Sequence, residues 1–258
     1  MSGGWTAVVT AAGHATRFRP FSTVVPKEML PVGDTPALAH VIDEALTAGA
    51  TDVVVITRPD DTVVPAFIDL LASDGAPVRC VPEDLAHGYG NGAGVLTLRD
   101  QLADASSFAV AFGDDVILGG ADLAAMRTLA ERPDVDAVIA AQVVPRDDIS
   151  SFGVVDLIPA DPDRVLGIRQ RPNPATVTEP LAVVSRLVLR PSIFDRIVPA
   201  AAARGEVDLG VAVGELATRG RVLVHRITGQ WVTVGEPHRY YQALQTYWDW
   251  ANQLATRP

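Results

Sequence analysis

Short apolar runs alternate with amphipathic segments through the first half of the chain. Runs rich in valine, isoleucine and alanine predict buried strands at residues 5–11, 52–57, 78–81, 108–112 and 135–143. Segments in which apolar residues recur every three or four positions predict helices at residues 37–48, 62–73, 91–102 and 121–131. Strands that alternate with helices are joined by right-handed crossovers. We therefore predict an α/β fold, with a mostly parallel mixed sheet and helices on both of its faces.

The second half of the chain changes character, because two strands follow each other there without a helix between them. We predict a β-hairpin, a strand, a helix, a further strand and a final amphipathic helix, at residues 152–156 with 164–168, 181–189, 207–219, 222–227 and 237–253. No low-complexity linker and no internal repeat interrupts the chain. Residues 1–258 are therefore predicted to form one domain, in which the second half is built onto the sheet of the first.

Composition narrows the class of protein. The 258 residues carry a net charge of −10, which excludes broad electrostatic capture of nucleic acid or of an anionic membrane. The N-terminus has no basic region, and no stretch approaches the roughly 20 apolar residues of a membrane span, so we predict a cytoplasmic protein. The single cysteine, Cys80, excludes an internal disulfide framework and a cysteine-rich zinc site. Its apolar neighbours favour a small core residue over a nucleophile.

The loop after the first strand is a candidate phosphate-binding loop, because ligands bind parallel sheets at the carboxyl ends of strands. It combines the small residues Ala11, Ala12 and Gly13 with Arg17 and Arg19. Small residues let the backbone approach an anion closely, and guanidinium groups match the geometry of phosphate oxygens. A solvated turn is the alternative interpretation of the same residues.

A second loop contains the only lysine of the chain, among twenty arginines. Lys27 lies between Pro26 and Pro31, two residues that stiffen the segment. A rigid backbone that presents one ammonium group suits phosphate binding. A surface lysine in an irregular loop is the alternative.

Taken together, these loops resemble the signature of a known family. Ala-Ala-Gly-His-Ala-Thr-Arg at residues 11–17 and Pro-Lys-Glu-Met-Leu-Pro at 26–31 resemble the sugar-1-phosphate nucleotidylyltransferases, most of all the bacterial UTP–glucose-1-phosphate uridylyltransferases. The resemblance continues through residues 112–116, 151–156, 182–189 and 205–209. It implies a Rossmann-like three-layer nucleotidyltransferase fold, with a nucleotide-binding half at 1–145 and a half at 146–258 that binds the sugar phosphate and includes the C-terminal helix.

The reaction implied by the resemblance is attack of a sugar 1-phosphate oxygen on the α-phosphorus of a nucleoside triphosphate, with loss of pyrophosphate. Arg17 would contact the β- and γ-phosphates, Lys27 would lie near the α-phosphate, and Asp114 would hold Mg²⁺. The neighbouring Asp115 points to the opposite face of the strand, so only one of the two is expected to serve. The resemblance further implies a homodimer or homotetramer. Other implied binding residues are Ala11, Ala12, Gly13, Thr16, Glu83 and Gly88 for the nucleotide, and Gly153, Arg171 and Glu206 for the sugar phosphate.

Glu83 departs from the family pattern, in which a glutamine commonly reads the edge of uracil or thymine. A glutamine both donates and accepts hydrogen bonds, whereas an ionised glutamate only accepts them. Glu83 would suit adjacent donors, such as those of guanine or a cytosine amino group. We therefore keep two hypotheses open beside UTP: a base other than uracil, or a Glu83 that merely faces solvent.

Further departures concern the phosphate and metal contacts. Arg171 replaces a lysine that grips the sugar phosphate, and a guanidinium fork differs from a point charge. Thr233 replaces a second metal-binding aspartate, so Mg²⁺ binding is expected to weaken. These changes leave two rivals to glucose 1-phosphate uridylyltransfer: a family member with another base, sugar or phosphonate substrate, and a homologue that binds nucleotide with little turnover.

The final helix concentrates aromatic residues, as it contains Tyr240, Tyr241, Tyr247, Trp248 and Trp250. Such a concentration is typical of a helix that caps the core, or of an interface between identical subunits.

Overall fold

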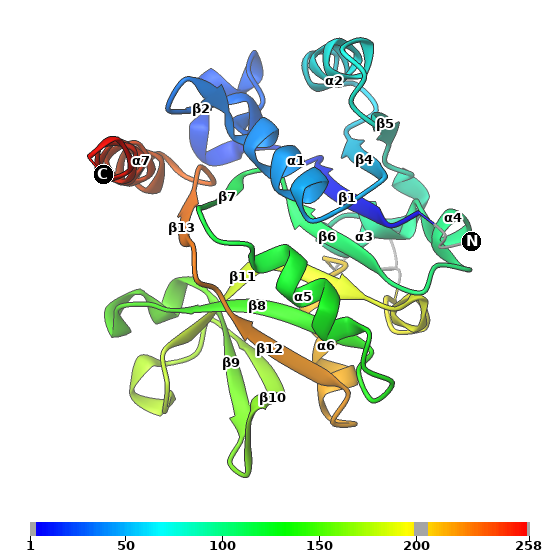
Figure 1. Ribbon diagram of the computed structural model, residues 1–258, viewed down its shortest axis with the longest axis vertical. Coiled ribbons are helices and arrows are strands. Elements are labelled where there is room, and N and C mark those ends of the chain that lie inside the picture. Colours follow the sequence, from blue (N-terminus) through cyan, green and yellow to red (C-terminus); the bar gives the residue numbers. More distant parts are fainter. Residues whose placement is uncertain (1–3, 199–205, 257–258) are drawn as a thin grey trace.

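The computed structural model describes residues 4–198 and 206–256 of the chain. Within these residues, nine strands form one mixed sheet (Figure 1). The strands are β1 (Thr6–Ala11), β4 (Asp52–Thr57), β5 (Val78–Pro82), β6 (Phe108–Phe112), β8 (Ala137–Val143), β9 (Gly153–Ile158), β10 (Asp161–Gln170), β11 (Leu181–Leu189) and β12 (Val222–Arg226). Their order across the sheet is β5-β4-β1-β6-β11-β8-β12-β10-β9.

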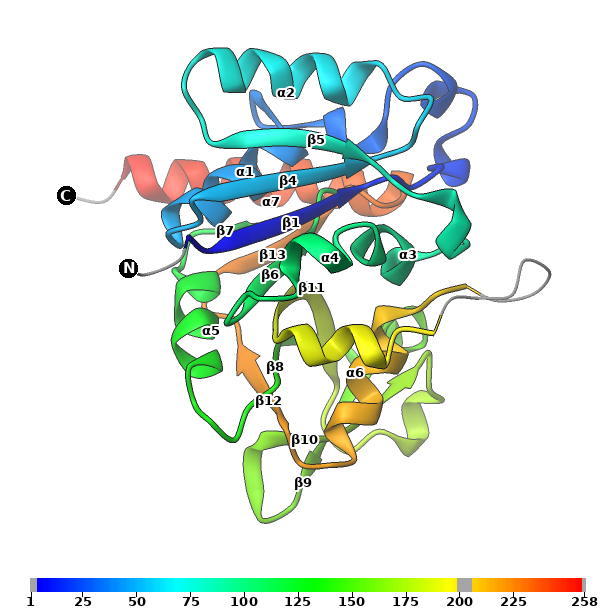
Figure 2. The same ribbon diagram turned by 90° about the vertical axis from the view of Figure 1, so that its right-hand side faces the viewer.

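The direction of the strands differs between the two parts of the sheet. β5, β4, β1 and β6 are parallel, so their carboxyl ends lie at one edge. β11 runs antiparallel to both β6 and β8, and β9 and β10 form the predicted antiparallel hairpin. A mostly parallel sheet is therefore correct only for the first part of the chain. In the second part, β12 lies parallel to β8, whereas the pairings of β9, β10 and β11 are all antiparallel. Figure 2 shows β5 and α2 (Val63–Ser73) at one end of the molecule and β9 and β10 at the other.

Helices cover both faces of the sheet, as predicted. One face carries α1 (Ala37–Thr47), α2 and α5 (Asp122–Ala130), and the other carries α3 (Asn91–Leu96), α4 (Arg99–Leu102) and α6 (Leu209–Ala217). Successive side chains of β1 enter opposite cores, with Val9 packed under the first group of helices and Val8 under the second. Burial on both faces explains why these strands are continuous apolar runs in the sequence.

Two predicted helices differ from the structure. The segment predicted as one helix at residues 91–102 is divided into α3 and α4. Between them, the N–H of Leu98 donates to the carbonyl oxygen of Val95, three residues back instead of four, and the side chain of Leu98 is buried in the core. The helix predicted at 207–219 begins only at Leu209. The backbone N–H of Val207 instead donates a hydrogen bond to the carbonyl oxygen of Tyr89 at 2.7 Å. Both differences come from contacts between segments that are distant in sequence.

A small ribbon that the sequence pattern did not predict joins the sheet to the C-terminal helix. It consists of β7 (Asp115–Leu118) and the antiparallel β13 (Gln230–Thr233). A second short pair, β2 (Pro31–Val32) and β3 (Thr35–Pro36), precedes α1. None of the described helices is long and apolar enough to cross a membrane.

The C-terminal helix α7 (Pro237–Ala255) covers part of the core and also presents aromatic residues to the surface. Tyr240, Tyr247 and Trp250 pack against the same core as α1 and α5. Tyr241 and Trp248 remain 60% and 54% exposed on the outer side. Core capping therefore explains only part of the aromatic content of this helix. The half-buried Cys80 packs against the core as well, and burial raises the pKa of its thiol to about 12.

Candidate active site

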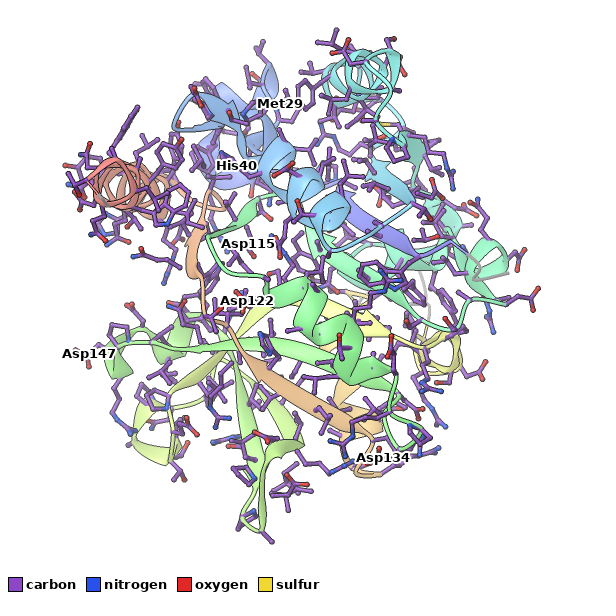
Figure 3. All side chains as sticks on the ribbon, viewed as in Figure 1. Met29, His40, Asp115, Asp122, Asp134 and Asp147 are labelled. Carbon is purple, nitrogen blue, oxygen red and sulfur yellow. The ribbon has the colours of Figure 1, made fainter. Side chains whose placement is uncertain are left out.

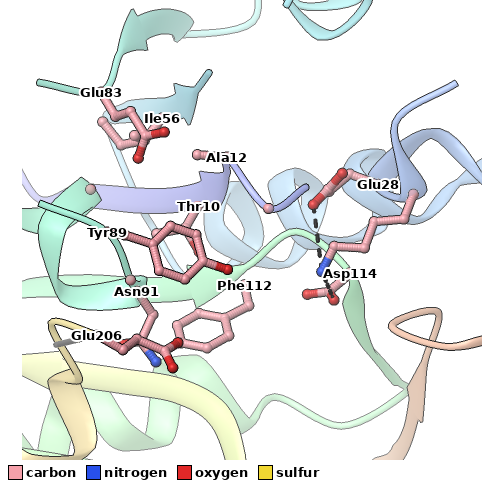
Figure 4. A pocket seen from close by; sticks show the side chains of 14 residues that line it. Thr10, Ala12, Glu28, Ile56, Glu83, Tyr89, Asn91, Phe112, Asp114 and Glu206 are labelled. Carbon is pink, nitrogen blue, oxygen red and sulfur yellow. Dashed lines mark hydrogen bonds and ion pairs between the residues drawn. The ribbon is translucent and has the colours of Figure 1, made fainter. Parts of the chain in front are cut away.

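Two connected pockets lie at the edge where the parallel strands end. We call the first the inner pocket; it has a volume of about 230 Å³ and is lined by residues of β1, β4, β6 and the loops after them. The outer pocket has a volume of about 550 Å³ and lies towards β13 and α7. Lys27, Phe112 and Asp114 line both, so they stand at the junction. Figure 4 shows the inner pocket, with Glu28 and Asp114 at one end and Glu83 at the other.

The junction is built around the ammonium group of Lys27. Its side chain is only 16% exposed, forms an ion pair with the carboxylate of Asp114, and lies 3.7 Å from an oxygen of Glu28. Burial alone would lower the pKa of Lys27, but the charges of Asp114 and Glu28 outweigh burial and raise it. Gly13 permits this approach, since a Cβ there would lie 3.1 Å from Cε of Lys27. The lysine is therefore charged and fixed against the first loop.

Asp114 and Asp115 have separate surroundings, as their alternation along the chain predicts. Asp114 lines both pockets, whereas Asp115 lines only the outer one, where its largely buried side chain accepts a hydrogen bond from Ser185. Burial, followed by the charge of Asp114, raises the pKa of Asp115. Figure 3 shows Asp115 towards the middle of the molecule, while Asp147 lies at its periphery.

A fully buried arginine, Arg186, supports the backbone of Asp114 and Asp115. Arg186 of β11 donates two hydrogen bonds to the carboxylate of Glu44 on α1, at 2.9 and 2.8 Å. Its Nη2 also donates to the carbonyl oxygen of Asp115 at 2.7 Å, and its Nη1 donates to that of Ser185 at 3.0 Å. Because the guanidinium group holds α1, β7 and β11 together, it fixes the backbone from which Asp114 projects.

Three arginines line the outer pocket together with Lys27: Arg17, Arg171 and Arg239. Arg239 of α7 donates to Glu236 at 2.8 Å and stacks over the ring of Phe152 at 4.4 Å, while Arg17 lies 3.9 Å from Glu236. Arg171 adopts φ = 46°, an unusual backbone conformation for a residue other than glycine. Asp114, Asp115 and Glu236 line the same cavity, so its four cations exceed its acidic side chains by one, which favours an anionic ligand.

Segments from the two halves of the chain meet at the inner pocket. Tyr89 pairs with Glu206, and Gly90 fits against this segment, since a Cβ there would lie 2.5 Å from the carbonyl oxygen of Val207. Oδ1 of Asn91 accepts the amide of Leu209 at 2.7 Å and so ties α3 to the start of α6. Asn91 is the first residue of α3, so its side chain serves the start of a different helix from its own.

The structure places the predicted residues in several groups. Ala12, Gly13, Lys27, Glu83, Asp114 and Glu206 line the inner pocket, and Arg17 and Arg171 line the outer one. Gly153 lines a third, smaller cavity of about 150 Å³ beside Asp208, which shares Phe112 with both pockets. The remaining three predicted residues do not line these cavities. Ala11 is completely buried within β1, Thr16 is exposed, and Gly88 directly precedes Tyr89, which lines the inner pocket.

Sequence reasoning missed several polar residues of the site. Glu28 is only 1% exposed, and its Oε2 has no hydrogen-bond partner among the described residues. Burial raises its pKa to about 7, against the opposing charge of Lys27. Glu236 and Arg239 were also missed. Glu28 lies in the signature segment itself, whereas no local signal distinguishes the last two from other helix-start residues.

The oxygen atoms near Asp114 suit a magnesium ion only in part. Thr233 donates a long hydrogen bond to the carbonyl oxygen of Asp114 at 3.4 Å and accepts the amide of Gly235 at 3.2 Å. Within residues 4–198 and 206–256, no group of three or more histidine, cysteine, aspartate or glutamate side chains could hold a metal. One carboxylate and a hydroxyl fit Mg²⁺ when substrate phosphates and water supply the remaining oxygens, which is how this ion commonly binds.

Comparison with known proteins agrees with this geometry. The chain is 28% identical to a UTP–glucose-1-phosphate uridylyltransferase of Bacillus subtilis, covering 89% of this chain and 86% of that one. It is also 28% identical to the enzyme of that name from Pseudomonas aeruginosa, covering 90% and 92%. A UDP-glucose pyrophosphorylase structure from Acinetobacter baumannii superimposes with a TM-score of 0.80 at 26% identity, covering 95% and 93%. The nucleotidyl transferase family model matches residues 6–249, and the chain therefore belongs to the nucleotidyl transferase family.

Proposed function

We propose that this protein joins UTP and glucose 1-phosphate to give UDP-glucose and pyrophosphate. The observation that carries the proposal is the position of Lys27 and Asp114 at the junction of the two pockets. A nucleoside fits the inner pocket, which combines the apolar Ile56 and Phe112 with polar residues. The cationic outer pocket suits phosphate groups. The relatives described above carry the name of this activity.

The reaction requires an oxygen of the sugar phosphate to bond the α-phosphorus while the bond to the pyrophosphate oxygen breaks. Negative charge on the phosphoryl oxygens must be balanced during this exchange. Lys27, fixed by Asp114, holds its proton and presents a full positive charge at the junction. Arg17, Arg171 and Arg239 would bind and orient the outer phosphate groups. The buried walls of the inner pocket would exclude water, which favours transfer to the sugar phosphate over hydrolysis.

Magnesium is expected to assist at the same position. Asp114 would hold the ion, with the hydroxyl of Thr233 close by and the other oxygens coming from the triphosphate and water. When bound, Mg²⁺ neutralises charge on the phosphates. Glu206 and the amide of Gly153 would bind sugar hydroxyls, since both lie on cavities that share Phe112 or Asn91 with the nucleotide side.

The same proposal includes a three-layer fold and an assembly of identical subunits. A three-layer Rossmann-like arrangement is consistent with helices on both faces of the sheet. A homodimer or homotetramer is supported by the exposed Tyr241 and Trp248 on α7, which lie on one side of the helix. Light scattering of the purified protein tests the oligomer.

A second candidate is favoured by Thr233: a protein that binds nucleotide with little turnover. Pyrophosphate release in the presence of UTP, glucose 1-phosphate and Mg²⁺ separates the two. Rapid release of pyrophosphate, with UDP-glucose as the second product, supports the transferase. Tight UTP binding without release of pyrophosphate, whether glucose 1-phosphate or another sugar 1-phosphate is supplied, supports the second candidate.

A further inference from the structure

Glu83 occupies the end of the inner pocket farthest from the phosphate-binding junction. Its amide donates to the carbonyl oxygen of Thr57 at 2.8 Å, which extends the pairing of β4 and β5 by one residue. This bond fixes the backbone beneath the side chain. Figure 4 shows the carboxyl group beside Ile56 at the pocket wall. A nucleotide whose phosphates lie at Lys27 would therefore place its base near Glu83.

The carboxyl group of Glu83 has no hydrogen-bond or ion-pair partner among the residues that the structure describes. Burial is the main cause that raises its pKa; Asp60 adds to this effect and Arg58 opposes it. Arg58 is engaged elsewhere, since it donates to the carbonyl oxygen of Gly13 at 2.9 Å and to Asp61 at 3.3 Å. Other titratable groups on the surrounding elements and across the pocket are His14, Lys27, Glu28, Asp84, His87, Tyr89, Asp114 and Glu206.

The pairing edge of uracil determines which form of Glu83 can bind it. This edge presents an N–H donor next to carbonyl acceptors. A carboxylate has acceptors only, so it satisfies the donor but repels the neighbouring carbonyl oxygen. A neutral carboxylic acid has one O–H donor and one free acceptor, which match the two groups of uracil together. Leaving one of these polar groups unpaired in a closed pocket would cost binding affinity.

We infer that Glu83 recognises uracil as a neutral carboxylic acid, so that its carboxyl group stays protonated while the nucleotide is bound. The inference rests on the proposed function, because it takes the uridine nucleotide as the ligand. A proton taken up by Glu83 is then part of the binding equilibrium. Below the pKa of Glu83 in the free protein, binding takes up no proton. Between that pKa and the higher pKa in the complex, each nucleotide takes up one proton, and affinity falls about tenfold for each unit of rising pH.

UDP-glucose is the probe for the experiment, because both of its phosphates are linked on two sides and do not titrate near neutrality. We would measure its binding by titration calorimetry between pH 5.5 and 8.5, in buffers of different ionisation enthalpy, which gives the number of protons taken up. We expect the wild type to take up close to one proton for each UDP-glucose bound. Glu83→Gln supplies a permanent donor and acceptor, so it should lose this uptake and bind with little pH dependence.

Two controls isolate the contribution of Glu83. Glu28 also titrates near neutrality, and comparing the wild type with Glu83→Gln removes its contribution because both proteins contain it. Glu179→Gln changes an exposed glutamate that pairs with Arg226, and it should retain the wild-type proton uptake.

Equal proton uptake in the wild type and in Glu83→Gln would overturn the inference and leave the proposed function intact. Tighter binding of GDP-glucose than of UDP-glucose, increasing with pH, would also overturn it, because guanine offers two adjacent donors to a carboxylate. No binding of UDP-glucose by either protein at any pH would overturn the proposed function together with the inference.

Discussion

Lys27 and Asp114 are 87 positions apart in the chain and form an ion pair at the junction of the inner and outer pockets. Glu28 follows Lys27 directly, and its buried carboxyl group lies on the other side of the ammonium group. One positive charge is thus held between two acidic side chains. A bound polyphosphate would meet a cation that the protein has already oriented, which lowers the reorganisation needed during the reaction.

Lys27→Ala is expected to lower kcat/KM for UDP-glucose formation about 100- to 1000-fold, because the fixed charge at the reacting phosphate is lost. Initial rates of pyrophosphate release measure the effect. Arg79→Ala is the matched control, since it removes an exposed ion pair with Asp52 far from the pockets, and its rate should equal that of the wild type. A Lys27→Ala enzyme that retains more than half the wild-type rate would contradict the assigned role.

Arg239→Gln is expected to weaken the binding of pyrophosphate and to lower kcat/KM about tenfold, because one charge-assisted contact of the outer pocket is removed. Titration with inorganic pyrophosphate and Mg²⁺ measures the binding directly. Arg226→Gln, which changes an exposed arginine paired with Glu179, should behave as the wild type. Equal pyrophosphate affinity in the two variants would remove Arg239 from the phosphate site.

Thr233→Asp is expected to reduce the Mg²⁺ concentration that gives half-maximal activity by about tenfold, since it adds a second carboxylate near Asp114. Without metal, repulsion between the two carboxylates should lower the melting temperature, and Mg²⁺ should restore it. Thr233→Val removes the hydroxyl without adding charge and should show neither effect. If Mg²⁺ dependence is the same in all three proteins, then the metal does not lie beside Thr233.

Asp122→Asn is expected to reduce the free energy of unfolding by about 2 kcal/mol at pH 7, because its new NH₂ group would face the amide of Gly229. The Asp122 carboxylate accepts hydrogen bonds from Thr228, Gly229 and His225, at 2.8 to 3.1 Å. Denaturant unfolding of both proteins measures the difference. An undiminished stability in the variant at pH 7 would show that these bonds contribute nothing.

The same residue sets a pH dependence of stability. Burial alone would raise the pKa of Asp122, but the bonds from Thr228 and the other donors outweigh burial, so its pKa lies below the usual value in the folded protein. The unfolded state then binds more protons, and the stabilisation is present above the unfolded pKa of about 4. It is lost as the pH falls through the folded pKa. The gap between the wild type and Asp122→Asn should therefore close in acid and remain constant above about pH 5.

Much of the site was predictable because the relevant signals are local. The signature loops lie next to a strand whose position is evident from its apolar run, so Gly13 and Lys27 could be placed at the end of β1. Strand alternation predicted that only one of Asp114 and Asp115 would serve, and the family resemblance favoured Asp114. The contributions of Glu236 and Arg239 could not be predicted, because α7 reaches the outer pocket only through the β7–β13 ribbon. That ribbon depends on a pairing between segments more than 100 residues apart.

The sequence by itself determined the alternation of strands and helices, the position of the two signature loops after the first strand, and the family. Periodicity and short motifs encode these properties within a few neighbouring residues. Only the tertiary structure decided where the helix before Leu98 breaks, which direction β11 runs, which arginines gather around the outer pocket, and that Glu83 and Asp114 line the same inner pocket. These outcomes depend on burial and hydrogen bonding between distant segments, and no local pattern specifies such contacts.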